Sequence, residues 1–339
     1  MLLHFVSKSS SFVTKYQLIV LDKYDIILLG GAMYSIKIPK KVNTDYNGFS
    51  SIISLLDECH THKNDEITLD FSSNIWFEAN LFAVLGCILS QAPQRNGIYF
   101  SNIGSKLTNV MRKNGFGVKL NSEIFKPIPD KFNTVIPYIA VKCKSNDDFT
   151  LLLSGLLEKF VYEKILNRSE MTLVKDNTKK QIASSFGEIF VNCVQHGDSF
   201  AKIFLCGQLF PNLKKLNICI VNTGKTISDN VESHFALKNI SLDSLKYQNY
   251  IDWAVQYGST TKECSTGGLG LYEIRSFIQK NHGQMHICSG KEYWQINNQG
   301  NVITSELKSN FYGTVVNLEF NINDSTEFSC DKIDVNSIL

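Results

Sequence analysis

The sequence predicts an α/β protein built from two domains. Its 339 residues are roughly twice the length of a typical domain of about 150 residues. Hydrophobic residues make up 43% of the chain and charged residues 19%, which is typical of folded globular proteins. Strand-like and helix-like segments alternate, a pattern that favours sheets covered by helices. Three of the six prolines, Pro127, Pro129 and Pro137, lie within residues 121–148, where we expect the change of domain.

The first domain is predicted over residues 1–125, with residues 1–33 left unassigned. Short apolar runs predict strands at 34–38, 67–71 and 98–103. Apolar residues at spacings of three and four predict helices at 47–59, 77–89 and 107–113. The last helix is expected to end at Asn114-Gly115, a suitable C-terminal pair. Strands separated by helices usually pair in parallel, so we expect a parallel sheet here.

The second domain is predicted over residues 149–322, after a linker at 126–148 and before a C-terminal tail at 323–339. The helices expected in it are at 149–166, 178–195, 244–257 and 269–280. The strands expected in it are at 201–209, 216–222, 284–289 and 315–322.

Charge and cysteine content argue against several classes of protein. The chain has 34 basic and 32 acidic side chains, a net charge of +2, which argues against a general binder of nucleic acids. The longest apolar run, residues 26–34, is too short to span a membrane, and the N-terminus lacks the pattern of a secretion signal. The nine cysteines form no Cys-x-x-Cys pair and most have apolar neighbours. We therefore expect a cytoplasmic protein with reduced cysteines and no membrane partner.

The first candidate site motif is segment 188–197, Glu-Ile-Phe-Val-Asn-Cys-Val-Gln-His-Gly. Glu188, Asn192 and His196 are four residues apart and share one helix face, while apolar residues cover the others. A carboxylate, an amide and an imidazole are costly to bury without partners. Taken alone, the segment fits best a helix whose polar stripe faces solvent.

Two further motifs contain glycines where the chain turns. In segment 218–227 a buried strand leads into Asn222-Thr-Gly224, where a glycine lets the backbone approach a ligand, although this is also ordinary turn chemistry. In segment 258–272, Gly-Ser-Thr-Thr-Lys precedes Gly-Gly-Leu-Gly-Leu-Tyr. Glycines that lead into a helix leave backbone N–H groups free at its positive end, which suits a phosphate chain. A flexible loop is the alternative, but three glycines in four residues disfavour a helix start unless something binds there.

In order and spacing, these motifs resemble those of the GHKL ATP-binding domain (the Bergerat fold), which gyrase, the heat-shock chaperone, histidine kinases and the mismatch-repair ATPase share. Residues 188–197 match its N box, residues 222–227 its G1 box and residues 267–271 its G2 box. His282-Gly283 and Gly313-Thr314 match two further recurring positions. The resemblance covers residues 149–322 and implies a two-layer α+β sandwich that binds ATP and Mg²⁺.

The resemblance gives each matching residue a role. Asn192 would bind Mg²⁺, for which an amide oxygen is a suitable hard ligand, and Glu188 would be the catalytic base that activates water. Backbone amides of the G2-box glycines would hold the phosphates, residues 260–262 would belong to a lid, and Thr314 would contact adenine together with residue 222. The residues expected to bind nucleotide are Asn192, Asn222, Gly224, Thr226, Thr260, Thr261, Lys262, Gly267, Gly268, Leu269, Gly270, Leu271 and Thr314.

Two residues depart from the G1-box pattern. Asn222 replaces an aspartate that accepts a hydrogen bond from the adenine amino group. Because an amide carbonyl can accept the same bond, we expect ATP binding to be retained at equal or lower affinity. Thr226 replaces the second glycine, which predicts a stiffer hinge at the lid.

The first domain resembles, less specifically, the STAS domain of anti-sigma-factor antagonists. The resemblance rests on residues 67–71, 77–89 and 98–102 and on the helix that ends at Gly115. Phosphorylatable members carry Asp-Ser-Ser/Thr where this chain has Glu78-Ala79-Asn80. Since Ala79 has no hydroxyl, the resemblance implies a docking or scaffolding module without a phosphorylation switch. An unrelated small α/β domain is the alternative.

Together, these observations lead us to expect a Mg²⁺-dependent ATPase whose nucleotide state orders residues 225–266 and so controls binding of a protein partner. The first alternative is a Ser/Thr protein kinase of the anti-sigma-factor type, in which Glu188 deprotonates a hydroxyl. The second is a non-enzymatic scaffold that keeps ATP as a structural ligand. The identity of the partner is open, and so is homodimerisation on ATP binding.

Overall fold

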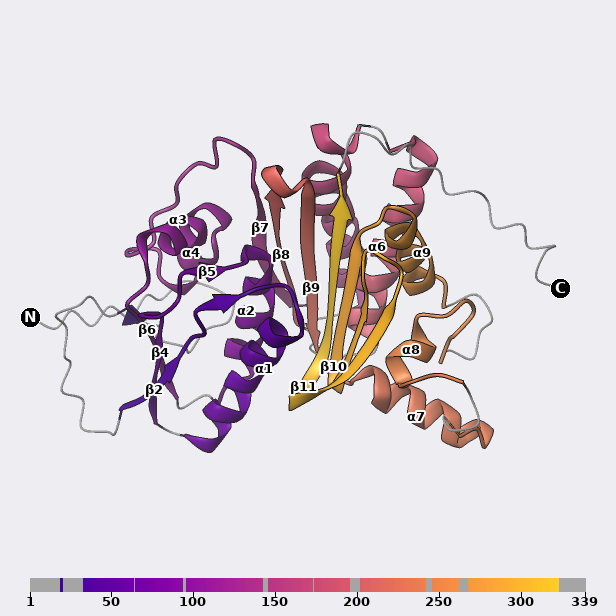
Figure 1. Cartoon of the computed structure of the whole chain (residues 1–339), viewed down its shortest axis with the longest axis horizontal. Coiled ribbons are helices and arrows are strands. Elements are labelled where there is room, and N and C mark those ends of the chain that lie inside the picture. Colours follow the sequence, from indigo (N-terminus) through magenta and orange to yellow (C-terminus); the bar gives the residue numbers. More distant parts are fainter. Residues whose placement is uncertain are drawn as a thin grey trace, which may run out of the picture.

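The computed structural model of the protein describes residues 19–20, 33–63, 65–93, 96–142, 146–172, 174–195, 202–241, 246–261 and 268–322. Of the residues that the structure describes, 44% are helical and 30% are in strands, so the predicted α/β class is confirmed. Its elements form four layers: a parallel sheet, a group of helices, an antiparallel sheet and a second group of helices (Figure 1).

The first layer is a parallel sheet in the order β1-β6-β4-β2. Its strands are β1 Ile19–Val20, β2 Met33–Lys37, β4 Glu66–Asp70 and β6 Gly97–Ser101. The helices of this half are α1 Tyr46–Thr61, α2 Phe82–Gln91, α3 Ser105–Asn114 and α4 Phe116–Leu120, with a 3-10 turn at Ala79–Leu81. Two short strands, β3 Lys41–Val42 and β5 Trp76–Phe77, pair with each other. Gly115 ends α3 in the left-handed conformation, with φ of 83°, as the sequence predicts.

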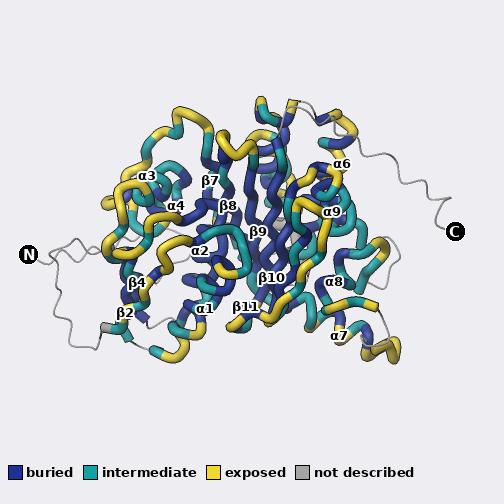
Figure 2. Tube along the Cα trace, in the orientation of Figure 1, coloured by how far each residue is buried: buried dark blue, intermediate teal, exposed yellow. Residues whose placement is uncertain are grey.

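The third layer is an antiparallel sheet in the order β10-β11-β9-β8-β7. Its strands are β7 Val135–Lys142, β8 Lys202–Phe210, β9 Lys215–Thr223, β10 Gln284–Ile296 and β11 Val302–Asn321. Side chains of β9 alternate between the two faces: Ile218 and Ile220 belong to one core, Cys219 and Val221 to the other. This sheet is therefore covered on both sides, and Figure 2 shows its strands as largely buried.

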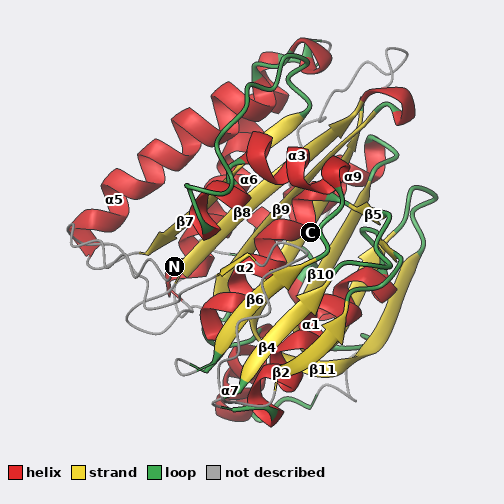
Figure 3. Ribbon diagram, turned by 90° about the vertical axis from the view of Figure 1, so that its left-hand side faces the viewer, coloured by secondary structure: helices red, strands yellow, loops and turns green. Residues whose placement is uncertain are grey.

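The fourth layer covers the face of the antiparallel sheet that carries Ile218 and Ile220. It contains α5 Asn146–Gly155, a π-helical segment Leu156–Leu166, a 3-10 turn Ser169–Met171, α6 Asp176–Gln195, α7 Ile227–Lys238, α8 Tyr250–Ala254 and α9 Gly270–Lys280. Figure 3 shows α5 as part of one long helical rod. The neighbours α6 and α9 pack against each other.

The segment at 126–148 differs from the plain linker expected there, because it contains β7. This strand pairs with β8 and has no second neighbour among the strands that the structure describes, so it forms one edge of the sheet as described. The pairing register shifts between Ile136 and Ile139, on either side of Pro137. Proline is tolerated at such an edge, since no ladder hydrogen bond is lost there. The proline that indicated a linker therefore lies in an irregular edge strand.

Other differences lie in the second half. Helix α7 was not predicted. Its buried residues are Val231 and Phe235, and two apolar positions are too few to show a helical period in the sequence. Helix α8 is much shorter than the expected 244–257. Strands β10 and β11 extend into a long hairpin, whose turn includes Gly300 with φ of 81°.

One of the two hydrophobic cores is shared between the halves, while the other lies within the second half. Helices α1 and α2 pack on the face of the antiparallel sheet that is opposite the fourth layer. The resulting cluster joins Phe49 and Phe82 of these helices to Cys219, Val221 and Val315 of the sheet. Burial of this apolar area ties the halves together.

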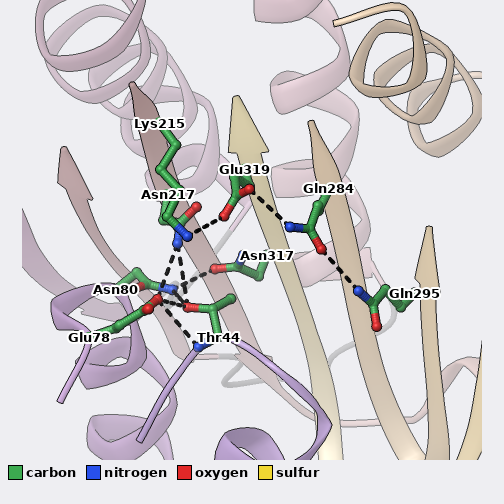
Figure 4. A network of polar contacts seen from close by, with 9 residues as sticks. All are labelled: Thr44, Glu78, Asn80, Lys215, Asn217, Gln284, Gln295, Asn317 and Glu319. Atoms are coloured by element: carbon green, nitrogen blue, oxygen red, sulfur yellow. Dashed lines mark hydrogen bonds and ion pairs between the residues drawn. The ribbon is translucent and has the colours of Figure 1, made fainter. Parts of the chain in front are cut away.

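A buried polar network crosses the same interface (Figure 4). The Glu78 carboxylate accepts hydrogen bonds from the Thr44 hydroxyl at 2.5 Å and from Asn217 Nδ2 at 3.2 Å. Asn80 Nδ2 donates to Asn317 Oδ1 at 2.8 Å. On the same sheet face the contacts continue through Lys215, Glu319, Gln284 and Gln295. The segment Glu78-Ala79-Asn80 therefore makes its polar contacts with other parts of the same chain.

The structure also bears on the cysteines and on possible membrane-spanning helices. Six cysteines lie in the described part of the chain, and all of them are buried and outside disulfides. Burial raises the pKa of the Cys59 thiol to about 11, which keeps it protonated. Among the described residues, no helix has the length and apolar character needed to cross a membrane.

Candidate functional site

One pocket gathers most of the predicted site residues from three separate motifs. It lies in the fourth layer, where α6, α7, α8 and α9 meet the antiparallel sheet. The predicted residues that line it are Glu188, Asn192, Asn222, Thr260, Thr261, Gly268, Gly270, Leu271 and Thr314. Three others, Gly224, Thr226 and Leu269, adjoin lining residues in sequence. The remaining two, Lys262 and Gly267, lie outside the described residues, as do His196 and Gly197.

The first wall of the pocket is the contact between α6 and α9. The backbone N–H of Gly270 donates to Glu188 Oε2 at 2.6 Å. A Cβ atom at position 270 would lie 2.5 Å from Glu188 Cβ, so only glycine permits this approach. The bond joins a carboxylate to the positive end of a helix, where both the charge and the free N–H favour it.

A second carboxylate lies close to Glu188. Burial and the Glu188 charge raise the pKa of Glu273, while the Ser185 hydroxyl, 3.4 Å from Glu273 Oε2, lowers it. Ser185 and Glu188 lie one turn apart on α6, and Glu273 lies in the first turn of α9. Two carboxyl groups close enough to influence each other therefore lie where α6 packs against α9.

The floor of the pocket is formed by neighbouring residues of β9 and β11. Asn222 and Thr314 are directly paired in the register of these strands. Asn222 Nδ2 donates to the Thr223 carbonyl at 3.2 Å, which leaves Asn222 Oδ1 as an acceptor for a ligand. Gly313 permits the close strand contact, since a Cβ there would overlap the Asn222 carbonyl oxygen.

A residue that the sequence analysis missed holds this floor in place. The Ser289 hydroxyl is buried, accepts from the Ile227 N–H at 2.8 Å and donates to the Gly313 carbonyl at 2.8 Å. It also lies 3.0 Å from Thr314 Oγ1. Because the Ser289 proton goes to Gly313, the Thr314 hydroxyl donates to Ser289 and offers its lone pairs to a ligand. A serine within an apolar strand gives no sequence signal for this role.

Gly268 lies against the loop that follows α8. Gly268 has φ of 89°, and a Cβ there would overlap the Ser259 carbonyl oxygen. This close contact places Thr260 and Thr261 at the pocket beside Gly270. The positive φ and the close backbone both require glycine at position 268.

Further lining residues were not singled out from the sequence: Lys225, Asn230, Trp253 and Ser259. Lys225 brings a positive charge and lies inside the matched segment 222–227, so that segment could have indicated it. Asn230 and Trp253 lie on α7 and α8, the two helices that the sequence placed poorly. The signal for α7 was present in Thr226-Ile-Ser-Asp229, which has the spacing of a capping box.

Thr226 is the N-cap of α7. Its hydroxyl accepts from the Asp229 N–H at 3.0 Å, and the Asp229 carboxylate accepts from the Thr226 N–H at 2.9 Å. Thr226→Ala is expected to lower the free energy of unfolding by about 1 kcal/mol, because the capping bond is lost. Urea denaturation measures this change. Ser233→Ala, which removes an exposed hydroxyl farther along α7, is the control and should cost less than half as much. Equal losses in the two variants would contradict the capping role.

Asn192 is the pocket residue best suited to coordinate a cation together with a bound phosphate ligand. Its side chain is half-buried, lines the pocket and makes no hydrogen bond to another residue that the structure describes. An amide oxygen suits Mg²⁺, and phosphate oxygens and water would complete the coordination. Within the described chain, no group of three or more His, Cys, Asp or Glu residues forms a metal site by itself. The Asn192 amide oxygen therefore fits a cation whose other ligands are phosphate oxygens and water.

Comparison with known protein families and with curated proteins finds no match for this chain.

Proposed function

We propose that the protein is a Mg²⁺-dependent ATPase whose second half is a GHKL (Bergerat-fold) ATP-binding domain. The observation that carries the proposal is the pocket described above. Residues of the N-box, G1-box and G2-box segments, from Glu188 to Leu271, line it together with Thr314. Motifs that resemble one family and are distant in sequence would have no reason to meet in one pocket if the resemblance were accidental.

The pocket offers complementary groups for a purine nucleotide. Ile189, Ile220 and Val316 give it apolar walls beside Asn222, a combination that suits a flat base with one hydrogen-bonding edge. Asn222 Oδ1 can accept from the adenine amino group, as the aspartate of the family does. The Gly270 N–H, the hydroxyls of Thr260 and Thr261 and the Lys225 charge suit phosphates. Mg²⁺, bound through Asn192, would offset the phosphate charge.

Hydrolysis would use Glu188 as the general base. Its carboxylate would take a proton from water as the water oxygen bonds to the γ-phosphorus. The bond from that phosphorus to the β,γ-bridging oxygen breaks, which releases ADP and inorganic phosphate. Glu188 then returns its proton to solvent.

A nucleotide-dependent partner surface would lie on α7 and α8. These helices contact each other and contribute Asn230 and Trp253 to the pocket. Leu237, near the end of α7, is 85% exposed, and Tyr257, three residues after α8, is 44% exposed, so apolar side chains are available for contact there. A ligand that moves α7 would change what this surface presents.

The first half would be a STAS-like module with a scaffolding role. Support comes from the parallel sheet and from the burial of Glu78-Ala79-Asn80 against the second half. A segment buried in this way is not accessible to a modifying enzyme, which agrees with the missing hydroxyl at Ala79.

Nucleotide binding tests the proposal directly. Isothermal titration calorimetry with ATP and Mg²⁺ should show one site per chain, with little heat from GTP because Asn222 Oδ1 repels the guanine carbonyl oxygen. Asn192→Ala should weaken ATP binding about tenfold or more in the presence of Mg²⁺, while adenosine binds equally to both proteins. Asn298→Ala, which removes an exposed amide from the β10–β11 turn, is the matched control and should change nothing. A chain that binds neither ATP nor adenosine would contradict the proposal.

A further inference from the structure

We infer that the Glu188 carboxylate and the phosphates of a nucleotide compete for the same backbone N–H, that of Gly270. This inference rests on the proposed ATP site and adds to it a form of regulation. When the phosphates of the nucleotide bind, they displace the Glu188 carboxylate from its hydrogen bond to Gly270, so that it can act as the general base.

The bond between Glu188 and Gly270 is well formed. Its length is 2.6 Å, at the short end even for hydrogen bonds to a charged group. Gly270 is the first residue of α9, which has 11 residues, so its N–H has no partner inside the helix. The Glu188 carboxylate therefore occupies the Gly270 N–H to which a phosphate oxygen would bind.

Packing leaves little room for both anions. The backbone at Gly270 approaches Glu188 so closely that a Cβ would lie 2.8 Å from Oε2. An oxygen of a phosphate cannot approach the same N–H while the carboxylate lies there. Binding of phosphate at Gly270 therefore requires the Glu188 side chain to leave.

Charge acts in the same direction. Glu273 lies in the first turn of α9, and the Glu188 charge contributes to the raised pKa of its carboxyl. Two carboxylates at one helix N-terminus already offset its positive end. Phosphates would gain affinity when Glu188 turns away from Gly270, and the released carboxylate would then be free to accept a proton from water. A base held in this way acts only when its substrate is bound.

The test compares a ligand that has phosphates with one that lacks them. Calorimetry would measure ADP and adenosine, with Mg²⁺, on the wild type, Glu188→Gln and Glu188→Ala. ADP is not hydrolysed, so loss of turnover does not affect the result. Both variants should bind ADP about tenfold more tightly than the wild type, because a competing charge-assisted bond is weakened or removed. Adenosine should bind equally to all three proteins.

Glu273→Gln is the matched control, since it removes a charge from the same helix turn and leaves the Glu188 bond intact. Its gain in ADP affinity should be clearly smaller. A gain equal to that of Glu188→Gln would show simple charge repulsion and overturn the competition. Unchanged or weaker ADP binding by Glu188→Gln, with adenosine binding preserved, would also overturn it. Absence of binding of both ligands to the wild type would contradict the proposed function itself.

A spectroscopic measurement does not depend on affinity. The amide proton of Gly270 should resonate far downfield in the wild type, because it donates to a carboxylate over a short distance. Glu188→Gln should shift it upfield. A resonance that is the same in both proteins would contradict the bond on which the inference depends.

Discussion

Glu188→Ala is expected to bind ATP at least as tightly as the wild type and to hydrolyse it at least about a hundredfold more slowly. A positioned general base contributes roughly a hundredfold to ten-thousandfold to a rate, and Glu188 is the pocket carboxylate that α6 places one turn before Asn192. Phosphate release at saturating ATP measures the rate, and calorimetry measures the affinity. The combination of retained binding and lost turnover separates a missing base from a collapsed pocket.

Glu232→Ala is the matched control for this experiment, because it removes an exposed carboxylate from α7. It should hydrolyse ATP at the wild-type rate. If Glu188→Ala were as active as this control, another group would be the base. Label from γ-labelled ATP that appears on a protein instead of as free phosphate would indicate the kinase alternative. Tight ATP binding with no turnover in the wild type would indicate a scaffold that keeps ATP as a structural ligand.

A chain restricted to residues 130–339 is expected to aggregate or to remain unfolded. Removal of the first half would uncover the face of the antiparallel sheet that α1 and α2 cover. The apolar side chains of that face include Phe204, Cys206, Cys219, Val221, Tyr293, Phe311 and Val315. Each large side chain would lose about 1.5–3 kcal/mol of stabilisation by burial, and the total is comparable with the whole net stability of a typical domain.

The control for this truncation is a chain of residues 1–322, which keeps both halves and lacks the residues that follow Ile322. It should elute as a folded species and melt within a few degrees of the intact protein. Size-exclusion chromatography and thermal unfolding compare the three proteins. A soluble 130–339 chain with a cooperative melt near that of the intact protein would mean that the halves are independent domains.

Much of the local structure could be predicted from the sequence, and the reasons are physical. Helices α6 and α9 have strong apolar periods, and Gly115 has a conformation that few other residues adopt, so these elements were expected. Asn222, Gly268 and Gly270 of the pocket lie where a strand ends or a helix begins, in segments whose glycines permit close backbone contacts. Such positions are visible in a single sequence because clustered glycines are otherwise unfavourable beside a helix start.

The shared core could not be predicted in the same way. Periodicity shows that a residue is buried but not which element covers it. In β9, Leu216 to Val221 form a nearly continuous apolar run, which indicates that both faces of the sheet are buried. Nothing in this run shows that α1 and α2 are the helices that cover one of these faces. Strand β7 and helix α7 were missed because Pro137 and a sparse apolar pattern outweighed weaker signals.

The polar network between the halves restricts how this protein can be recombined with others. Asn80, Asn217 and Asn317 are fully buried, and each depends on a partner from the opposite half. A chimera in which a different first half supplies an apolar surface would leave Asn217 and Asn317 without those partners, at about 1–3 kcal/mol for each. The two halves are therefore expected to be inherited and exchanged together, with Thr44, Glu78 and Asn80 as the matching set on one side.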